Sequence, residues 1–431
     1  MIESVQSKLK TRVLVFPCGS ENAAEIHQAL RYSLHVELIG ASSVEDHGRF
    51  RFENYIGGLP NINSDDFNQV FQRLIADNGI NVVFATHDTV AEYLSPHADA
   101  MGFHLVNGDI QATAVARRKS STYELFAGSD WTPRVYPNVE SVTDWPVVIK
   151  PDLGQGGQGV TKAATAAEAA LAVENVAQPV ITEYLPGQEL TVDCFTDRHR
   201  NVIFVGPRTR ERVKAGITMR SQLLEVDPAI EEIAKEINRR LVLRGPWFFQ
   251  LKKDRQGQWK LLEISCRVAG AMVSQRARGV NLPLMTIQDY LGRDIKALVN
   301  PSVRLIERNI STKAEIDFEF DNVFVDLDDT LIIDGFATPQ VLGFIYQMHR
   351  LKRRIVLITR HAYDIGETLA RARISSLLFD EVIHITDGSA KSKFVKENSI
   401  FVDNHFPERL DVALNCGVPV FDVDALEFFI R

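Results

Sequence analysis

"IKPDLGQGGQGV", residues 149–160, is the stretch that decides the fold of this 431-residue chain. It opens as an apolar run ending at Lys150 and continues into a loop built on four glycines, Gly154, Gly156, Gly157 and Gly159. Backbone N–H groups in a loop without side chains can close around phosphate oxygens, and the Lys150 ammonium can approach the same phosphates. Because no GK[ST] ends the loop, we expect a β-turn after it rather than the helix of a Walker A motif. A glycine hairpin without a ligand is the alternative.

A second informative stretch, FFQLKKDRQGQWKLLEISCR, covers residues 248–267. Two apolar runs flank a turn at 254–257, which predicts a β-hairpin with Gln250 and Glu263 facing each other on adjacent strands. Two oxygen ligands at this place suit Mg²⁺, which keeps waters and substrate phosphates as its other ligands. Arg267 follows the second strand as a fork-shaped phosphate donor.

In this order, the motifs resemble the ATP-grasp superfamily over residues 10–300. The resemblance implies ATP and Mg²⁺ as cofactors. The nucleotide contacts that it implies are Lys119, Lys150, Gly154, Gln155, Gly156, Gly157, Gly159, Glu183, Tyr184, Leu185 and Glu189. The metal ligands that it implies are Gln250, Glu263 and Ser265. Ser265 stands where the family has asparagine. Gln250 stands where a carboxylate is usual in the family, and in this the chain resembles carbamoyl phosphate synthetase large subunits. A second Mg²⁺ is therefore expected to bind weakly.

The same resemblance implies a carboxylate–amine ligase. The γ-phosphoryl group of ATP would pass to a carboxylate, and an amine would then displace phosphate from the acyl phosphate. The protein contributes mainly positioning and charge neutralisation to such a reaction. In PRTRERVKAGITMR, residues 207–220, we expect Arg208 to hold the acceptor or the transferred phosphoryl group, with Arg267 as a second catalytic residue. Solvated surface charge is the alternative for these arginines.

VFVDLDDTLI, residues 323–332, carries a different phosphate chemistry. An apolar strand ends by delivering Asp326 and Asp328, and ligands gather at the carboxyl ends of strands in open parallel sheets. The two carboxylates can share one Mg²⁺, with Asp326 as a nucleophile on phosphorus and Asp328 as general acid and later base. Thr359 and Asp403 follow two later apolar strands and support this interpretation. A simple acidic turn is the alternative.

These residues resemble the haloacid dehalogenase superfamily of phosphatases over residues 321–431. The catalytic residues that the resemblance implies are Asp326, Asp328, Thr359 and Lys391, and the metal ligands are Asp326, Asp328 and Asp403. Lys391 is preferred as the motif lysine, although Lys393 is an open alternative. Between the first motif and Thr359 the sequence has room for one helix, so no cap domain is expected there.

Together the patterns predict an α/β and α+β multidomain protein. Short strands alternating with helices over residues 1–118 predict a Rossmann-like pre-ATP-grasp domain. Longer alternating strands over 119–305 predict an ATP-grasp domain with an antiparallel sheet and helices on one face. Residues 306–320 are expected to form a linker. Residues 321–431 are expected to form a Rossmann-like haloacid dehalogenase domain without a cap.

Composition narrows the classes of function. A formal net charge of −8 and a pI near 5.8 argue against a nucleic-acid binder, whose affinity rests on clustered Lys and Arg. The four cysteines are scattered without a CxxC pair, as expected for free thiols in a reducing compartment. The sequence has no signal-peptide pattern at Met1 and no apolar run of about 18 residues, so we expect a cytoplasmic protein without a membrane partner.

Our leading hypothesis is a bifunctional enzyme, in which an ATP-grasp ligase is fused to a phosphatase that acts on a phosphorylated substrate or on the ligated product. The expected partners are a small-molecule carboxylate and an amine, one of them a candidate to carry phosphate. A homo-oligomer is a candidate assembly. Two alternatives remain: a ligase with a catalytically silent C-terminal interaction domain, and an ATP-grasp kinase that phosphorylates a hydroxyl group.

Overall fold

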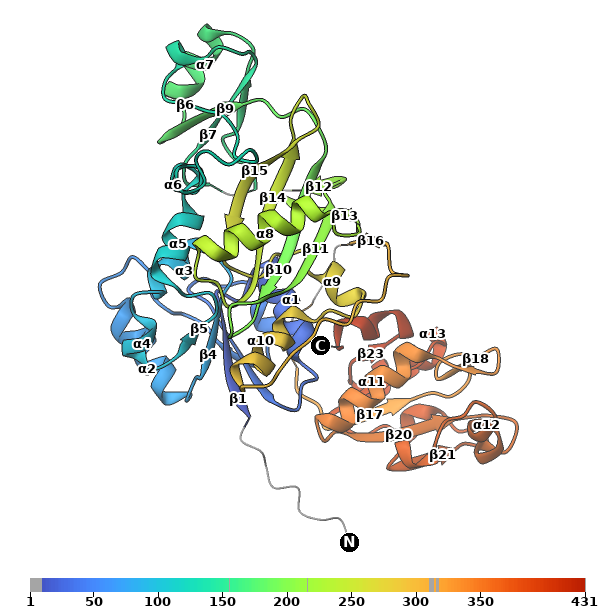
Figure 1. The fold of residues 1–431 in the computed structure, drawn as a ribbon. Helices are drawn as coiled ribbons and strands as arrows, with labels where there is room; N and C mark the ends of the chain where they lie inside the picture. Colours follow the sequence, from blue (N-terminus) through green and yellow to red (C-terminus); the bar gives the residue numbers. More distant parts are fainter. Residues whose placement is uncertain (1–9, 155, 215, 310–313, 315–317, 431) are drawn as a thin grey trace. The chain divides into compact units, whose positions relative to one another are not determined.

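The computed structural model describes the chain except residues 1–9, 155, 215, 310–313, 315–317 and 431. Gln155, expected to contact the nucleotide, lies outside the described residues. The chain forms two compact units, Met1–Ile310 and Ser311–Arg431 (Figure 1). The division falls inside the expected linker, whereas the expected boundary at residue 118 runs within the first unit.

The first unit begins with a five-stranded parallel sheet of order β3-β2-β1-β4-β5. The order reverses between β1 and β4, and ligands of such sheets bind where the carboxyl ends of these strands part. The Ser20 hydroxyl accepts a hydrogen bond from the Ala23 N–H and starts α1 at this place. The strands are β1 (Thr11–Phe16), β2 (Val36–Ala41), β3 (Asn54–Ile56), β4 (Val82–Ala85) and β5 (His104–Leu105). The helices are α1 (Glu21–Leu30), α2 (Phe67–Asp77), α3 (Asp88–Leu94), α4 (Ala98–Met101) and α5 (Ile110–Arg117).

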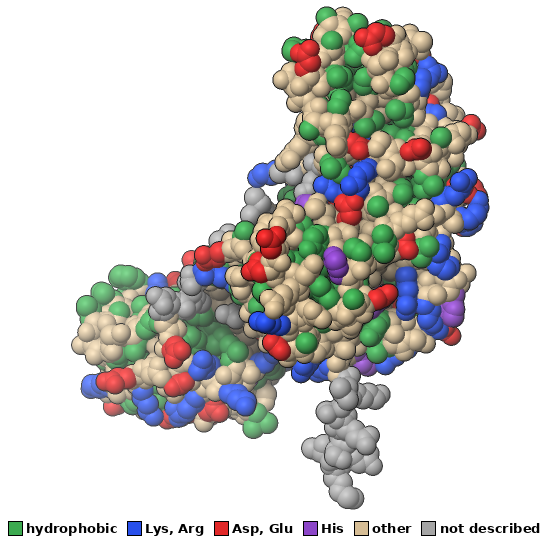
Figure 2. Space-filling model, turned by 90° about the vertical axis from the view of Figure 1, so that its left-hand side faces the viewer, with side chains coloured by type: hydrophobic (Ala, Val, Ile, Leu, Met, Phe, Trp, Pro, Cys, Tyr) green, Lys and Arg blue, Asp and Glu red, His purple; other side chains and the backbone are tan. Residues whose placement is uncertain are grey.

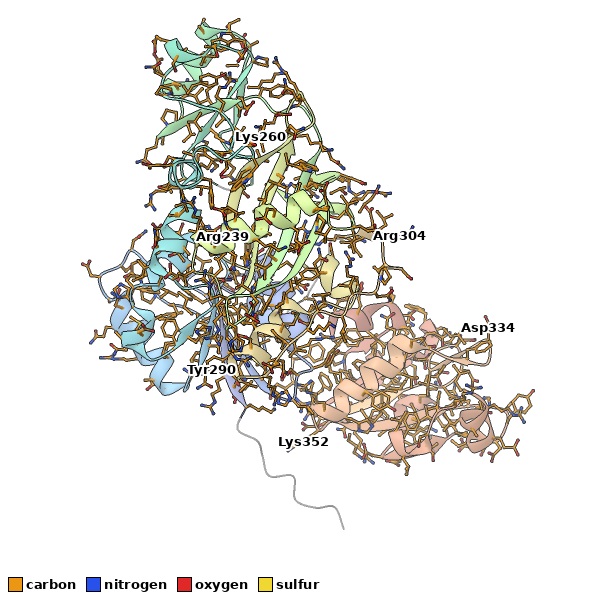
Figure 3. The ribbon with its side chains drawn as sticks, viewed as in Figure 1. Arg239, Lys260, Tyr290, Arg304, Asp334 and Lys352 are labelled. Atoms are coloured by element: carbon orange, nitrogen blue, oxygen red, sulfur yellow. The ribbon has the colours of Figure 1, made fainter. Side chains whose placement is uncertain are left out.

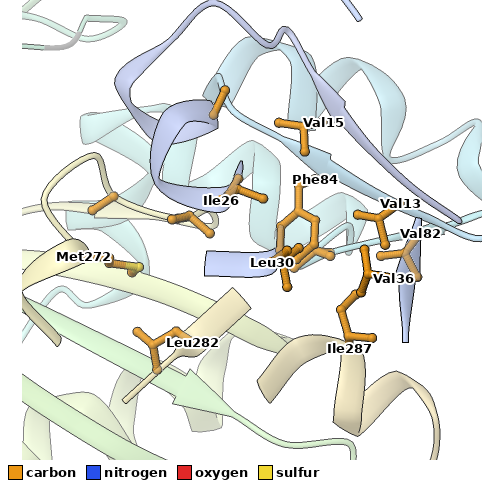
Figure 4. Packing of buried hydrophobic residues seen from close by; sticks show 14 of the residues in the cluster. Val13, Val15, Ile26, Leu30, Val36, Val82, Phe84, Met272, Leu282 and Ile287 are labelled. Carbon is orange, nitrogen blue, oxygen red and sulfur yellow. The ribbon is translucent and has the colours of Figure 1, made fainter. Parts of the chain in front are cut away.

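One face of this sheet is covered by parts of the chain that lie far apart in sequence. Val13, Val15 and Phe84 on that face pack with Ile26 of α1 and Ile287 of α10 (Leu282–Tyr290) (Figure 4). Burying these apolar side chains from both parts of the unit favours one fixed arrangement of the two. The parallel sheet and the later antiparallel sheet therefore share one core.

The rest of the first unit is built on antiparallel sheets, as predicted. A four-stranded sheet of order β11-β10-β14-β15 packs one face against α8 through apolar side chains such as Ile233 and Trp247. A smaller sheet, β6-β9-β7-β8, carries the glycine loop, and a third, β12-β13-β16, adds a hairpin. The strands are β6 (Val135–Tyr136), β7 (Val147–Pro151), β8 (Thr161–Ala163), β9 (Pro179–Glu183), β10 (Glu189–Thr196), β11 (Val202–Thr209), β12 (Arg212–Lys214), β13 (Ile217–Gln222), β14 (Gly245–Lys253), β15 (Trp259–Ser265) and β16 (Leu305–Glu307). The helices are α6 (Lys119–Leu125), α7 (Ala166–Glu174), α8 (Pro228–Arg240) and α9 (Val273–Ala277).

The second unit is a five-stranded parallel sheet of order β21-β20-β17-β22-β23. Its order reverses between β17 and β22, so residues that follow these strands meet at one edge. Between β17 and β20 the chain forms only a short hairpin and α11, which fits the expectation of no cap. The strands are β17 (Asn322–Val325), β18 (Ile332–Ile333), β19 (Phe336–Ala337), β20 (Arg354–Thr359), β21 (Glu381–His384), β22 (Ser399–Val402) and β23 (Val420–Phe421). The helices are α11 (Pro339–Arg350), α12 (Ile365–Arg371) and α13 (Phe406–Cys416).

The distribution of charged side chains on the surface agrees with the composition of the chain, which contains both Lys and Arg and Asp and Glu. On the face that Figure 2 displays, Lys and Arg side chains are interspersed with Asp and Glu side chains. In the described part of the chain, no helix combines the length and the apolar character that a membrane crossing requires.

Candidate active sites

A cavity of about 770 Å³ opens in the first unit between the parallel sheet and the antiparallel sheets. It brings together most of the residues that the sequence singled out. The expected site residues that line it are Lys119, Lys150, Gly154, Gly156, Gly157, Glu183, Tyr184, Leu185, Glu189, Arg208, Gln250, Glu263 and Arg267. Gly159 and Ser265 are not among the lining residues. The cavity is large enough for a nucleotide and a small acceptor.

The floor of the cavity is a row of side chains across the antiparallel sheet. Thr191 on β10 pairs with Arg208 on β11 and with Gln250 on β14, and Gln250 pairs with Glu263 on β15. Directly opposite residues point to the same face of a sheet, so these four side chains share the cavity face. The predicted facing of Gln250 and Glu263 is confirmed. Burial raises the pKa of Glu263, against the lowering effect of the Lys119 ammonium, so a bound cation would stabilise its charged form.

Lys150 is held in place above this row. Lys150 is 6% exposed, and its ammonium donates to the Tyr123 hydroxyl at 2.6 Å and lies 4.9 Å from the centre of the Tyr123 ring. Burial, and next the Lys119 ammonium, lower the pKa of Lys150 to about 7, against the opposing effect of Glu263. Lys119 donates weakly to the backbone carbonyls of Asp152 and Gly154, at 3.4 and 3.5 Å. Two lysines thus flank the start of the glycine loop, where phosphates are expected.

Nucleotide affinity is expected to fall as the pH rises above about 7. Below this pH Lys150 is already charged, whereas above it the neutral amine must take up a proton when phosphates bind. At most one proton is taken up, so affinity falls by up to about tenfold per pH unit. Calorimetric titration of ADP in buffers of different ionisation enthalpy counts the protons. Lys150→Met should bind ADP weakly and without this uptake, and undiminished uptake by the variant would contradict the assignment.

Arg208 is more deeply buried than a solvated arginine. It is 2% exposed, and its Nε and Nη2 donate to Asp193 at 2.7 and 3.2 Å. Gln275 also donates to Asp193, at 3.0 Å. Among the described residues, no partner reaches Arg208 Nη1 or the hydroxyl of Thr191, although both atoms are buried. Two adjacent donors on residues that line the cavity therefore have no hydrogen-bond partner among the described residues, which is rare for buried polar groups.

Removing Asp193 is expected to destabilise the first unit strongly. Asp193→Ala leaves the buried Arg208 guanidinium without its partner, which costs about 3–5 kcal/mol of unfolding free energy. Urea denaturation followed by tryptophan fluorescence measures this selectively, because all four tryptophans lie in the first unit. Asp144→Ala, which breaks an exposed ion pair with Arg134, is the matched control and should leave the transition unchanged. Equal midpoints for the two variants would contradict the prediction.

Ser265 does not lie where a metal ligand is needed. Its hydroxyl donates to Asp88 at 2.6 Å, and Asp88 also accepts from Arg267 Nε at 2.9 Å. The expectation of Ser265 as a third ligand is therefore not met, because the short side chain turns toward α3 instead of the cavity. Burial would raise the pKa of Asp88, but the Arg267 guanidinium and the Ser265 hydrogen bond lower it further than burial raises it. The carboxylate is therefore charged. Asp88 thereby fixes Arg267 at the cavity wall.

The outer end of the cavity carries the residues expected to hold the nucleoside. Glu189 lies 2.6 Å from Arg210 Nε and 3.4 Å from Lys252 Nζ. Glu183 accepts from the Arg134 N–H at 2.8 Å. The Lys162 ammonium lies 4.1 Å from the centre of the Tyr184 ring. A ribose hydroxyl approaching Glu189 would have to share the carboxylate with these cations.

The β12–β13 hairpin reaches the glycine loop across the cavity. A Cβ atom on Gly216, which has φ +79°, would lie 2.4 Å from the Gly156 Cα. A residue with a side chain would therefore clash with the loop backbone at this place and would also be strained in this conformation. The close approach of the two glycines lets the hairpin lie over the expected phosphate positions.

The second unit contains a separate cluster at the carboxyl edge of its sheet. The Lys391 ammonium donates to Asp326 Oδ1 at 2.5 Å and to Asp403 Oδ2 at 2.7 Å, and all three residues are buried. Burial raises the pKa of Asp326 to about 6, Lys391 opposes this, and Asp403 adds to it. The structure therefore places Lys391 between the two carboxylates. Among the described residues, Lys393 makes no such hydrogen bond or ion pair with these two carboxylates.

Asp328 lies at the open side of this cluster. Thr359 donates to Asp328 Oδ2 at 3.4 Å, and His361 Nδ1 lies 2.8 Å from Asp328 Oδ1. His361 Nε2 in turn lies 2.7 Å from the Thr368 hydroxyl, which fixes the imidazole ring. Asp328 keeps 53% of its side chain exposed, so it can meet a substrate from solvent. The Thr330 hydroxyl lies 3.4 Å from Asp326 Oδ2.

Within the described residues, no group of three or more His, Cys, Asp or Glu side chains is close enough to hold a metal ion. The residues present still suit Mg²⁺, which needs one or two carboxylates and takes its other ligands from water and phosphate. Glu263 and Gln250 in the first unit, and Asp326 with Asp403 in the second, provide such oxygen atoms.

Residues 175–312 match the family described as "ATP-grasp in the biosynthetic pathway with Ter operon". The chain contains an ATP-grasp domain. Its fold is shared with N5-carboxyaminoimidazole synthetase from Staphylococcus aureus complexed with ADP, at TM-score 0.57 and 14% identity, over 68% of this chain and 82% of that one. The L-amino acid ligase from Bacillus licheniformis is similar at TM-score 0.54 and 17% identity, over 66% and 74% of the two chains.

The chain also has a curated relative. The D-alanine–D-alanine ligase of Fusobacterium nucleatum is 29% identical over 111 residues, which are 26% of this chain and 39% of the relative. The match thus spans about two fifths of that ligase. A third solved structure, the biotin carboxylase domain of Hydrogenobacter thermophilus 2-oxoglutarate carboxylase with MgADP and bicarbonate, has TM-score 0.56 and 16% identity, over 68% and 72% of the chains.

Several residues that shape the ATP-grasp cavity escaped the sequence analysis. Asp88, Tyr123 and Asp193 each hold a predicted residue, yet none belongs to a motif. Asp193 carried a signal, because a charged residue within the apolar run of β10 requires a buried partner. In the second unit, His361 also carried a signal, since it follows Thr359 by two residues at a strand end.

Proposed function

We propose that the protein is an ATP-dependent, ADP-forming carboxylate–amine ligase that uses Mg²⁺. The observation that carries the proposal is the row of Arg208, Thr191, Gln250 and Glu263 on the floor of one cavity with Lys150 and the glycine loop. Such a row would put an anion site beside a metal site, as phosphoryl transfer to a carboxylate requires. Amino acid ligases among the similar proteins further support this class of substrate.

We assign a part in the reaction to seven of the residues that line the cavity. Lys150 and Lys119 hold the phosphates of ATP beside the glycine loop. Mg²⁺ held by Glu263 and Gln250 would neutralise charge on the transferred phosphoryl group. Arg208 Nη1 and the Thr191 hydroxyl orient the acceptor carboxylate. Arg267, fixed by Asp88, stabilises the acyl phosphate until the amine attacks and phosphate leaves.

An ADP-release screen of carboxylate and amine pairs tests this function. Amino acids and phosphorylated amines belong in the panel, and mass spectrometry identifies the ligated product. ADP release that requires both a carboxylate and an amine supports the ligase. Release with a hydroxyl acceptor and no amine, together with a phosphorylated product, would favour the kinase instead.

We further propose that the second unit is a Mg²⁺-dependent phosphatase of the haloacid dehalogenase type. This is supported by Asp326 and Asp403 on the two sides of the Lys391 ammonium, with Asp328 at the open side. Asp326 would attack phosphorus while Asp328 gives a proton to the leaving oxygen, and water would then release phosphate from the aspartyl group. The full chain would thus ligate and dephosphorylate related small molecules. Absence of turnover on a panel of phosphate esters would favour a silent interaction domain.

A further inference from the structure

Three exposed aromatic side chains belong to the segments that follow strands of the second sheet at its carboxyl edge. Phe336 belongs to the β18–β19 hairpin after β17, Tyr363 follows β20, and Phe406 follows β22. They are 76%, 75% and 63% exposed. Among the described residues of this unit, Tyr346 is the remaining tyrosine or phenylalanine that is largely exposed. Most of the exposed aromatic surface of the unit is therefore at the edge that carries Asp326.

Each of the three is linked to the aspartate cluster through neighbouring residues or through its hairpin. The Tyr363 ring lies 5.5 Å from the His361 ring, and His361 contacts Asp328. Phe406 begins α13 directly after His405, whose N–H donates to Asp403 Oδ1 at 2.7 Å. The hairpin of Phe336 is anchored by the bridge between Asp328 and Ile332.

The three loops leave the sheet from adjacent strands, because β20, β17 and β22 are neighbours. Segments that follow these strands therefore begin at the same edge of the sheet as Asp326. A phosphate ester with its phosphorus at Asp326 must extend its alcohol portion toward this side. The faces of these aromatic rings offer stacking surface, and Tyr363 alone among the three adds a hydroxyl group. Because only a hairpin and α11 lie between β17 and β20, no inserted cap domain covers these rings.

We propose that Phe336, Tyr363 and Phe406 form an aromatic rim that binds a planar aromatic group in the alcohol portion of the phosphate ester. The proposal rests on the proposed phosphatase and names its substrate class. An Asp326 oxygen forms a bond to phosphorus as the ester P–O bond breaks, and Asp328 gives its proton to the departing aryl or alkyl oxygen. Water then attacks phosphorus, loses a proton to Asp328, and releases inorganic phosphate and free Asp326.

The test compares two probes, p-nitrophenyl phosphate and glycerol 3-phosphate, with the full chain and Mg²⁺. Phe336→Ala, Tyr363→Ala and Phe406→Ala should each raise KM for p-nitrophenyl phosphate by about fivefold to tenfold and leave KM for glycerol 3-phosphate unchanged. Tyr346→Ala is the matched control. Its helix, α11, leads from the hairpin back to β20, and Figure 3 shows Asp334 of the hairpin and Lys352 after α11 at opposite ends of the unit.

The outcomes separate this inference from the proposed phosphatase. If the wild type hydrolyses both esters and the rim variants lose neither preference nor affinity, the rim proposal is wrong and the phosphatase stands. If the rim variants lose activity equally on both esters, the aromatic residues support the fold rather than the substrate, and the proposal also fails. If the wild type hydrolyses neither ester, the phosphatase and the rim are both rejected.

Discussion

Asp326→Asn is expected to reduce hydrolysis of p-nitrophenyl phosphate by at least about a thousandfold. The carboxamide has nearly the shape of the carboxylate, so it can keep the contacts with Lys391 and Thr330. It has no anionic oxygen to attack phosphorus, so the covalent step is lost. The measurement is initial rates with Mg²⁺ at a pH above about 6, where the Asp326 carboxyl of the wild type is charged.

Two comparisons make the result specific. Asp321→Asn changes an exposed carboxylate of the same unit, paired with Arg353, and should hydrolyse the ester at the wild-type rate. ADP formation by the ATP-grasp domain should be unchanged in Asp326→Asn, because the two clusters lie in separate compact units. Ester hydrolysis that survives in Asp326→Asn would assign the activity to another nucleophile.

Local patterns made much of the fold predictable. Apolar strands alternating with helices led to both parallel sheets, and the turn at 254–257 led to the hairpin that pairs Gln250 with Glu263. The structure also brings Lys150 and three glycines of the loop, Gly154, Gly156 and Gly157, to one cavity, since they belong to a short continuous stretch. Such features depend on neighbouring residues, and the sequence contains them directly.

Contacts between distant residues could not be read in the same way. Asp88 and Arg267 are 179 positions apart, and only the packing of the two parts of the first unit brings them together. The sequence therefore could not indicate that Ser265 would turn to Asp88 and leave the metal position. Arg208 was expected to meet a substrate, yet two of its nitrogens are engaged by Asp193 across the sheet. Only the third nitrogen, Nη1, remains without a partner among the described residues and could contact a substrate as predicted.

Because Ser265 is hydrogen-bonded to Asp88, metal binding in the first unit is expected to depend mainly on Glu263. Of the three residues expected to hold metal in the first unit, Gln250 is neutral and Ser265 donates to Asp88, so Glu263 carries the only charge of the set. Burial raises the pKa of Glu263, so the neighbouring cations only partly offset the cost of burying its negative charge. A divalent cation with ATP phosphates would supply that compensation.

Glu263→Gln is therefore expected to lower ADP-forming turnover by about a hundredfold or more. The variant keeps the shape and the cross-strand position but removes the charge that holds the cation. The expected cause can be measured without turnover, because Mn²⁺ binding in the presence of ADP, followed by electron paramagnetic resonance, should weaken in the same variant.

Gln250→Glu is the opposite change, because it adds a metal-binding carboxylate where Glu263→Gln removes one. It restores a second carboxylate directly opposite Glu263 and should tighten Mn²⁺ binding. Like-charge repulsion between the two half-buried carboxylates is then relieved by the cation, so this variant should also become more dependent on metal for its stability. Wild-type Mn²⁺ affinity in Glu263→Gln would place the cation elsewhere in the cavity. Loss of ADP binding without metal in that variant would instead indicate that Glu263 supports the loop lysines, because its carboxylate acts on both Lys119 and Lys150.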